Sequence, residues 1–285
     1  MPFALIFYLT ARRSLSASQN PLLATNPASM SLPPDRLDRF ARHIVLPEVG
    51  GMGQDRLTRA HVVLVGMGGI GNPALQYLAG AGVGRLTLVD SDVIEASNLQ
   101  RQTLFAASDV GRAKAEVAAE WTHRFDPALE VEAQVLRVTR DNARELVRDA
   151  DIVLDGCDNF ATRLAVSDAC VAEGVPLTSA ALGRFQGQVA NFAGHREGQP
   201  CYRCFVGDAF DAEDCDTCAE QGVLGAMVGM VGAFAAMHGL RALLENVSTL
   251  GDPQWGQLYL FNGMKPDMRS MRIAKDAGCS GCGSA

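Results

Sequence analysis

The residues best suited to chemistry in this sequence are two short cysteine pairs in its last third, Cys201-Tyr-Arg-Cys204 and Cys279-Ser-Gly-Cys282. Each pair places two thiolates on one tight turn, and two such turns supply the four sulfur ligands of a tetrahedral Zn²⁺ site. Redox dithiols share this spacing, and unlinked core cysteines are a third interpretation. Neither pair lies between a strand and a helix as a redox motif does, which favours structural Zn²⁺.

A glycine-rich turn in the first half of the chain is a second candidate site. An expected strand, His61–Val65, runs into a G-x-G-x-x-G motif, and an expected helix, Asn72–Ala81, follows. A second strand, Arg85–Val89, ends at Asp90. The glycines of the motif are Gly66, Gly68, Gly69 and Gly71. Such a turn lets the backbone approach a phosphate, the helix N-terminus favours its charge, and the acid can accept ribose hydroxyls. The pattern predicts a nucleotide, with close helix packing as the purely structural alternative.

Polar and cationic residues downstream favour ATP over NAD. The run Asn98-Leu99-Gln100-Arg101-Gln102 precedes Lys114, which lies on an expected helix over Arg112–Phe125. A phosphoryl centre needs cations and amides to offset developing negative charge, whereas hydride transfer does not. Taken singly, Arg101 and Lys114 would be interpreted as surface charges.

Two carboxylates follow the next expected strand, Asp151–Leu154, in the run Asp155-Gly156-Cys157-Asp158-Asn159. Open α/β sheets bind ligands at the carboxyl ends of their strands. A carboxylate there can hold Mg²⁺ on the phosphates of ATP. Alternatively, Asp155 and Asn159 provide turn and cap interactions for a helix over Asn159–Glu173.

Length and composition set the class of protein. The chain has 285 residues, of which 48% are hydrophobic and 20% charged, as in an ordinary globular α/β protein. The formal charge of −7 argues against a nucleic-acid surface. Eight cysteines, four of them in metal-like spacing, fit a reducing compartment, so we expect a cytoplasmic protein.

The chain divides into an extension, residues 1–30, and one α/β unit, residues 31–285, which includes both cysteine pairs. Pro2–Leu9 is apolar, but it is too short to span a bilayer and its arginines follow it instead of preceding it. We expect residues 1–30 to be disordered, with a start codon assigned too far upstream or an organellar address as alternatives.

Order is expected to return after this extension. Leu37, Phe40, Ala41 and Ile44 would share one face of a short helix, and its arginines, Arg36, Arg39 and Arg42, would lie on the solvated surface. Gly50-Gly51-Met52-Gly53 is expected to break the chain before the first strand.

Together these motifs resemble the MoeB/ThiF/HesA family, bacterial relatives of ubiquitin-activating enzymes, over about Leu37 to Cys282. Within that family the chain is most similar to MoeB-type adenylyltransferases. The matching segments are Arg39-Phe40-Ala41-Arg42-His43, Gly66 to Gly71, Asp90, Asn98 to Gln102, Lys114, Cys157-Asp158-Asn159 with Arg163, both cysteine pairs, and Cys218 before Glu220-Gln221-Gly222-Val223. The N-L-x-R-Q run, at its distance from the glycine loop, is the most discriminating.

The resemblance implies a reaction and a set of roles. The C-terminal glycine carboxylate of a ubiquitin-like sulfur carrier, MoaD-like or ThiS-like, would attack the α-phosphate of Mg-ATP for molybdenum cofactor biosynthesis, with thiamine or other sulfur transfer as the alternative pathway. By the same resemblance, Asp90 holds the ribose, Asp158 holds Mg²⁺, and Arg101 and Lys114 neutralise phosphate charge. Asn98 and Gln102 add polar phosphate contacts.

The family also implies a homodimer in which Arg42 completes the partner subunit's active site. Cys218 lies at the position where some relatives join covalently to the carrier, while MoeB-type enzymes release the adenylate. Its loop, Phe205–Gln221, is acidic, which should disfavour a thiolate. Cys157 and Cys170 are interpreted as core cysteines.

The C-terminal third should complete a Rossmann-like, doubly wound α/β fold. Val223–Leu244 approaches the length of a membrane span, but its many glycines suit a helix packed in a core or a dimer interface. Strands over Gln257–Phe261 and Met268–Ile273 then lead to the second cysteine pair, so zinc would join the C-terminus to the region that contains the first pair. The five histidines show no triad spacing and are interpreted as structural or surface residues.

Overall fold

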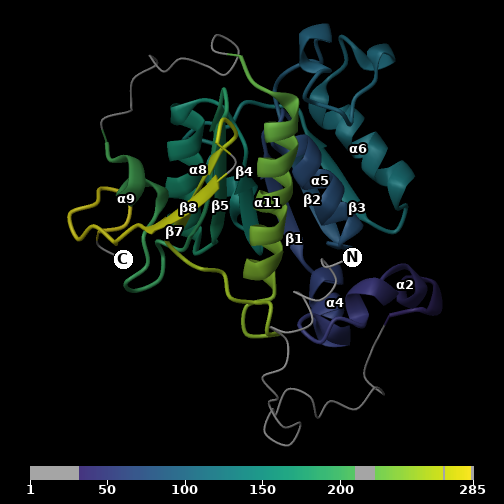
Figure 1. Ribbon diagram of the computed structural model, residues 1–285, viewed down its shortest axis with the longest axis horizontal. Helices are drawn as coiled ribbons and strands as arrows, with labels where there is room; N and C mark the ends of the chain where they lie inside the picture. The colour runs from purple at the N-terminus through teal and green to yellow at the C-terminus, as the bar shows by residue number, and fades with distance from the viewer. Residues whose placement is uncertain (1–31, 209–221, 266, 284–285) are drawn as a thin grey trace, which may run out of the picture.

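An eight-stranded sheet forms the centre of the molecule, in the order β3-β2-β1-β4-β5-β6-β7-β8 (Figure 1). The computed structural model describes residues 32–208, 222–265 and 267–283. The first five strands pair in parallel and the last three are antiparallel. The strands are β1 His61–Val65, β2 Arg85–Val89, β3 Glu130–Gln134, β4 Ile152–Asp155, β5 Leu177–Gly183, β6 Gln186–Phe192, β7 Gln257–Asn262 and β8 Asp267–Arg272. The α/β fold class predicted from the sequence is therefore confirmed.

Helices cover both faces of the sheet, so the parallel strands β1, β2 and β4 are buried on both sides, whereas β3 at the edge is largely accessible. Along β1, Val62 and Leu64 face one core with α5, α6 and α11, while Val63 and Val65 face a second core with α7 and α8. The helices are α2 Pro34–Arg39, α3 Ala41–Ile44, α4 Gly50–Thr58, α5 Gly71–Gly80, α6 Lys114–Phe125, α7 Ala143–Val147, α8 Phe160–Glu173, α9 Tyr202–Val206 and α11 Gly225–Leu243.

The long apolar helix α11 belongs to the first core. Within the described residues it is the one helix long and apolar enough to cross a membrane, and half of its apolar window is buried in the protein. It packs beside α5 and across β5 and β6, and Figure 1 shows it beside α5. Gly232 permits this approach, because a Cβ there would lie 2.4 Å from Cγ of Pro73. The prediction of a core helix is confirmed.

The N-terminal helices differ from the expectation in two ways. The expected single helix is interrupted at Phe40, whose ring is buried against Gly82, so Ala41 is left exposed. Arg36 is not on the solvated surface: it is buried, and its Nη1 lies 2.8 and 2.7 Å from the two carboxylate oxygens of Asp126. Pairing with a distant acid compensates the burial of this charge.

The glycine run before the first strand was predicted correctly only at its first residue. Gly50, with φ +64°, turns the chain, but Gly51 to Gly53 continue into the first turn of α4. Tertiary packing overrides the poor helix propensity of glycine here. A Cβ on Gly53 would lie 3.3 Å from Leu244, and the fully buried Gln54 donates a hydrogen bond to the carbonyl of Ala81 at 2.9 Å.

The predicted strands and helices around the two candidate sites are confirmed to within two residues at each end. Two predictions lie outside the described residues. These are the extension, residues 1–30, and Cys218 with residues 209–221 of its acidic loop.

Candidate functional site

The glycine loop connects β1 to α5 at the carboxyl edge of the sheet, where two glycines allow very close backbone contacts. Gly66 has φ +91°, and a Cβ there would lie 3.0 Å from the backbone nitrogen of Cys157. A Cβ on Gly71 would lie 2.0 Å from the carbonyl oxygen of Gly66. The loop is thereby pressed against the end of β4 and folded back on itself, which only glycine permits.

The other two glycines face different surroundings. A Cβ on Gly69 would meet Val228 of α11 at 2.7 Å, whereas the nearest atom to a Cβ on Gly68 would be Nε2 of Gln102 at 3.7 Å. In the described part of the chain, the N–H groups of Gly68 and Gly69 have no hydrogen-bond acceptor. Free N–H groups at a helix N-terminus are suited to bind an anion such as phosphate.

Asp90 lies at the end of β2 and holds the glycine loop. Its carboxylate accepts hydrogen bonds from the N–H of Met67 at 2.7 Å and of Asp92 at 2.8 Å. Burial raises the pKa of Asp90, and the positive charge of Lys114 partly opposes this shift. The buried Lys114 lies beside it, with Nζ 2.7 Å from Asp92. The structure therefore brings the predicted acid and the predicted cation together.

The polar run after β2 lies beside the glycine loop. Asn98 ends a short 3-10 helix, η3 Ala96–Asn98, and its side chain accepts a local hydrogen bond from Glu95 N. Nη1 of Arg101 donates to the carbonyl of Ser97 at 3.0 Å. Gln102 is 3% exposed, and its Oε1 has no hydrogen-bond partner in the described residues. A buried amide oxygen without a partner is costly, and it is suited to contact a ligand.

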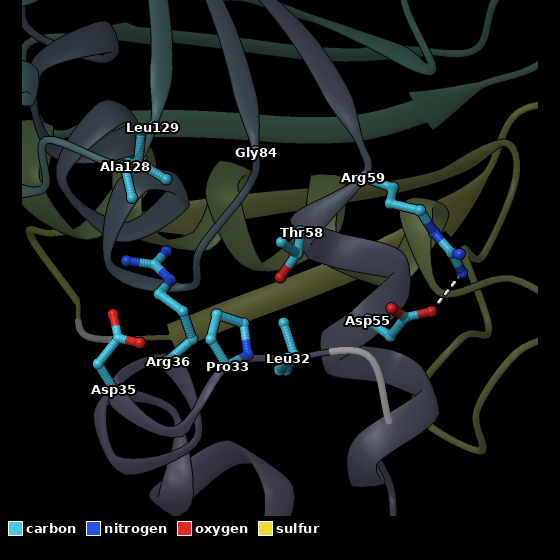
Figure 2. Close-up of a pocket in the computed structure, with 10 residues that line it drawn as sticks. All are labelled: Leu32, Pro33, Asp35, Arg36, Asp55, Thr58, Arg59, Gly84, Ala128 and Leu129. Atoms are coloured by element: carbon cyan, nitrogen blue, oxygen red, sulfur yellow. Dashed lines mark hydrogen bonds and ion pairs between the residues drawn. The ribbon is translucent and has the colours of Figure 1, made fainter. Parts of the chain in front are cut away.

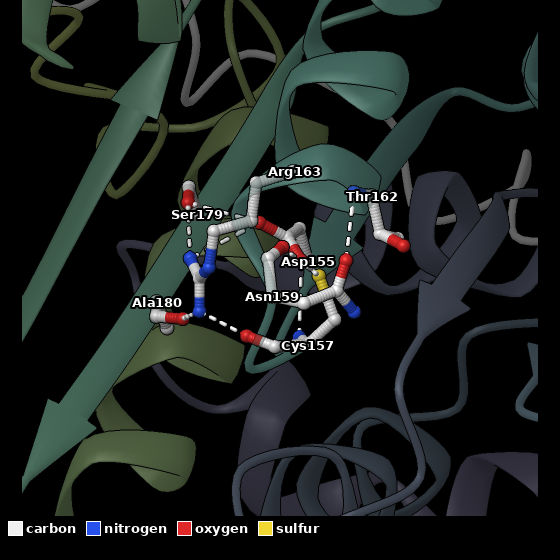
Figure 3. Close-up of polar contacts among 7 residues, drawn as sticks. All are labelled: Asp155, Cys157, Asn159, Thr162, Arg163, Ser179 and Ala180. Atoms are coloured by element: carbon white, nitrogen blue, oxygen red, sulfur yellow. Dashed lines mark hydrogen bonds and ion pairs between the residues drawn. The ribbon is translucent and has the colours of Figure 1, made fainter. Parts of the chain in front are cut away.

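The end of β4 carries two carboxylates with different surroundings. Asp155 is buried and accepts hydrogen bonds from Cys157 N, Ser179 and Arg163, as Figure 3 shows. Asp158 is exposed, and no described residue forms a hydrogen bond or ion pair with it. Of these two carboxylates, only that of Asp158 is without a partner among the described residues, and the alternative interpretation of Asp155 as a turn residue is confirmed.

Asn159 begins α8, and its side chain accepts a hydrogen bond from Thr162 N at 2.9 Å. This N-cap satisfies one of the free N–H groups of the first turn, as the alternative interpretation of Asn159 required. Cys157 lies between the two acids; burial and the charge of Asp155 raise its pKa well above the ordinary value. A neutral thiol is therefore expected at Cys157.

Arg163 of α8 is the centre of the network in Figure 3. It is 4% exposed, pairs with Asp155 at 3.2 Å, and donates to the carbonyl oxygens of Cys157 and Ala180. Despite its burial, the carboxylate of Asp155 keeps the pKa of Arg163 raised. This arginine fixes the turn that presents Asp158.

The four spaced cysteines meet at the other end of the antiparallel part of the sheet. Their sulfurs all lie within 4.8 Å of one another, with Sγ separations of 3.9 Å for Cys201 and Cys204, 3.6 Å for Cys201 and Cys279, and 3.5 Å for Cys204 and Cys282. Zinc–sulfur bonds of about 2.3 Å in a tetrahedron require sulfurs about 3.8 Å apart. The residues therefore fit Zn²⁺, and the predicted grouping of all four cysteines is confirmed.

Comparison with known proteins identifies the family. A family model described as "ThiF family" matches residues 40–281. This chain belongs to the ThiF family. The resemblance inferred from its motifs is thereby confirmed, and so is the prediction of an adenylyltransferase.

Three named relatives match most of this chain. It is 42% identical over 252 residues to sulfur carrier protein adenylyltransferase of Thermus thermophilus, covering 87% of this chain and 92% of that protein. It is 40% identical over 255 residues to SAMP-activating enzyme E1 of Haloferax volcanii, covering 90% and 92%. Adenylyltransferase and sulfurtransferase MOCS3 of Bos taurus is 43% identical over 258 residues, which span 90% of this chain but 55% of MOCS3.

Among solved structures, the crystal structure of E. coli MccB is similar to this chain, with a TM-score of 0.74 and 24% sequence identity over 87% of this chain and 72% of MccB. At this identity the likeness shows the fold alone. This ThiF-family chain and MccB therefore share a backbone fold.

Arg42 of this ThiF-family chain lies far from its own glycine loop. It is exposed on α3, and no described residue pairs with it. The neighbouring Phe40 and Gln54 pack on Gly82 and Ala81, at the C-terminal end of α5. The glycine loop is at the opposite end of this ten-residue helix, about 15 Å away at 1.5 Å per residue.

Sequence reasoning missed residues that support the zinc turns. Arg203, between two of the cysteines, is 7% exposed and pairs with Asp168 at 2.7 Å and Asp208 at 2.9 Å. Asp208 also accepts a hydrogen bond from Ser280, between the other two cysteines. The signal in the sequence for these ion pairs was an arginine inside a C-x-x-C turn, with acidic residues nearby.

A separate hollow of about 350 Å³ lies at the opposite edge of the sheet (Figure 2). Its walls include Arg59 and Gly84, which come just before β1 and β2, so it is remote from the glycine loop. Its two arginines are already paired, Arg36 with Asp126 and Arg59 with Asp55. The hollow therefore has no role in the site described above.

Proposed function

We propose that this protein activates the C-terminal glycine of a ubiquitin-like sulfur carrier as an acyl-adenylate, with a MoaD-like carrier for molybdenum cofactor biosynthesis as the first candidate. The observation that carries the proposal is the pairing of free glycine-loop N–H groups with the unpaired carboxylate of Asp158 at the adjoining strand end. Relatives named sulfur carrier protein adenylyltransferase and SAMP-activating enzyme E1 support a carrier protein as the substrate.

In the proposed reaction, a carboxylate oxygen of the carrier attacks the α-phosphorus of ATP. A carboxylate O–P bond forms, the bond from the α-phosphorus to the bridging oxygen of the β-phosphate breaks, and the electron pair leaves with pyrophosphate. The attacking carboxylate is already anionic, so no general base is required and the enzyme contributes positioning and charge neutralisation.

Each site residue then has a role. The glycine loop would receive the phosphates on its free N–H groups, and Asp90 would hold the ribose in addition to Met67. Arg101 and Lys114 would neutralise phosphate charge, while Gln102 and Asn98 would add polar contacts. Asp158 would hold Mg²⁺, which offsets the charge of the phosphates when bound.

The zinc cluster would serve the fold and not the reaction. With four cysteine sulfurs the coordination shell is complete, and a closed shell is typical of structural zinc. Thiols in this arrangement also fit a reducing compartment, so we propose a cytoplasmic enzyme.

We also propose a homodimer in which Arg42 reaches the partner subunit's phosphates. Its exposure and its position at the far end of α5 support a role outside its own subunit. An isologous dimer would give two equivalent sites, each built from both chains.

The test is exchange of labelled pyrophosphate into ATP with purified carriers. We expect exchange only with a carrier that ends in its native glycine, while the same carrier lacking that glycine serves as the control. MoaD-like and ThiS-like carriers compared in parallel would distinguish molybdenum cofactor from thiamine sulfur chemistry. Failure of every carrier to support exchange, with ATP bound nonetheless, would favour a non-catalytic nucleotide-binding protein. Binding of NADH in place of ATP would favour an oxidoreductase.

A further inference from the structure

Asn72, the second residue of α5, is a fully buried amide that the proposed reaction leaves without a role. Its Nδ2 donates to the carbonyl of Met67 at 2.8 Å, and its Oδ1 accepts from the N–H of Leu104 at 3.0 Å. A carbonyl can only accept and a backbone N–H can only donate, so this orientation of the amide is the only one that satisfies both.

The two partners of Asn72 belong to the two halves of the nucleotide site. Met67 lies in the glycine loop, and its N–H is held by Asp90. Leu104 is 32 residues from Asn72 in the chain and lies in the segment 98–105, which also contains Arg101 and Gln102. The side chain of Asn72 therefore connects the phosphate loop to the polar segment beside it.

Gln102 shows why this connection matters. It is two residues from Leu104, it is buried, and its Oε1 has no partner in the described chain. Its Nε2 lies 3.7 Å from where a Cβ on Gly68 would be, so it faces the open side of the loop. The hydrogen bond from the Leu104 N–H to Asn72 therefore sets the distance between the side-chain amide of Gln102 and the glycine loop.

We propose that Asn72 is a positioning residue, which holds the segment 98–105 at the distance from the glycine loop that ATP requires. The inference rests on the proposed use of ATP. Asn72 would not touch the nucleotide itself. It acts through Met67 on one side and through Leu104 on the other, which places Arg101 and Gln102 against the phosphates.

The experiment compares Asn72→Ala and Asn72→Asp with the wild-type chain. Alanine removes both hydrogen bonds, and aspartate keeps the shape but cannot donate to Met67. We expect faster hydrogen–deuterium exchange in peptides covering 98–105, and a KM for ATP raised about tenfold or more, because a displacement of about 1 Å can cost about a hundredfold. The KM for the carrier and the zinc content should not change.

Asn191 provides a matched control. It is also a fully buried amide with both ends bonded, to Thr178 and to the carbonyl oxygens of His238 and Pro253. Asn191→Ala should lower the melting temperature as Asn72→Ala does, without raising the KM for ATP. Where Asn72→Ala does not fold, Asn72→Ser replaces it, because the shorter hydroxyl cannot bridge both partners.

The outcomes are separable. A KM for ATP within twofold of wild type, or an equal rise in Asn191→Ala, would overturn the positioning role. Unchanged deuterium exchange over 98–105 would overturn it as well. A wild-type chain that binds no ATP would defeat the proposed function and the ATP role of Asn72, while the deuterium exchange would still show whether Asn72 holds the two segments together.

Discussion

The nucleotide end and the cysteine end of this protein treat polar groups in opposite ways. Around the glycine loop, Gln102 and Asp158 lack partners among the described residues, and loop N–H groups are free. Around the cysteines, Arg203 pairs with two acids and Asp276 N donates to the sulfur of Cys204 at 3.4 Å. Under the proposed function, polar groups that would contact an exchanging ligand lack protein partners, at a cost in stability, whereas groups around a structural metal would be hydrogen-bonded by the protein itself.

The two ends are not independent, because one buried arginine acts on both. Arg163 fixes the turn that carries Asp158, and its charge also opposes the rise that burial causes in the pKa of Tyr202. Tyr202 is the residue after Cys201. Damage at the cysteine end should therefore reach the nucleotide end through this interaction.

The largest effect is expected from opening the cysteine end with Cys282→Ser. Wild-type protein should contain about one zinc per chain by elemental analysis, and the variant should lose it. Because metal-binding energy is partly folding energy, the melting temperature should fall by more than about 10 °C. Cys170→Ala, which removes a buried thiol outside the cluster, should keep its zinc. A Cys201–Cys204 disulfide without metal would instead support the redox interpretation.

Asp158→Ala should have the opposite signature, with loss of activity and an intact fold. Since its carboxylate has no partner to lose among the described residues, the melting temperature should stay within about 2 °C, while carrier-dependent pyrophosphate exchange falls more than about tenfold, or about 1.4 kcal/mol. Asp155→Ala is the matched control. It leaves the buried Arg163 unpaired and should cost about 3–5 kcal/mol of folding free energy. Exchange above about a tenth of the wild-type rate in Asp158→Ala would contradict the Mg²⁺ role.

Re-pairing of subunits tests whether Arg42 of a second chain completes the nucleotide site that contains Asp158. Arg42→Ala and Asp158→Ala homodimers should each be nearly inactive. After dissociation and mixing, half of the dimers should be mixed, with one wild-type site of two, so recovery should approach about a quarter of wild-type activity. Each variant re-paired with itself is the control. Confirmed subunit exchange without any recovery would mean that Arg42 acts within its own chain or only structurally.

The smallest effect concerns His238, in the core between the two ends. Burial, and secondarily Arg241, lowers its pKa to about 4, and its Nδ1 has no partner among the described residues. As the pH falls, His238 is therefore protonated in the unfolded chain before it is protonated in the folded chain. The part of the unfolding free energy that depends on its neutral form is fully present above about pH 6.5 and is lost as the pH falls toward 4. At pH 5 the loss should be about 2 kcal/mol of unfolding free energy.

His238→Gln should remove that part of the acid dependence. Urea unfolding midpoints measured between pH 7.5 and 5 should fall less steeply in the variant than in wild type. His123→Gln is the control, because His123 is exposed and its replacement should leave the slope unchanged. Parallel slopes for wild type and His238→Gln would mean that this histidine is not held neutral in the core.

The strands that carry the site could be predicted because their signals are local. His61–Val65 and Arg85–Val89 are largely apolar runs. A glycine, Gly66, follows the first and an acid, Asp90, follows the second, and the structure has both strands with the same bounds. The carboxyl ends of parallel strands lie at one edge, so Gly66, Asp90 and Asp158 had to come near one another. The four cysteines were equally predictable, because few ligand sets share their spacing.

The errors arose where partners are distant in the chain. Arg36 is bonded to Asp126, 90 residues away, so a charge that looked solvated is buried. Glycines at 50–53 looked like a break, but Gly53 packs against Leu244 and Ser248, and Gly51 to Gly53 are helical. Neither contact produces a periodic pattern of residues, so neither could be predicted from the sequence.

The sequence by itself determined the fold class, the glycine loop, the cysteine ligand set and the residues that resemble a ThiF-family site. Only the tertiary structure decided which of two acids at the end of β4 is free, since Asp155 is buried against Arg163 and Asp158 is not. It also decided that Asn72 joins the glycine loop to Leu104. Residue type and spacing determine what a side chain can bind, but burial and distant partners determine whether it is already bound.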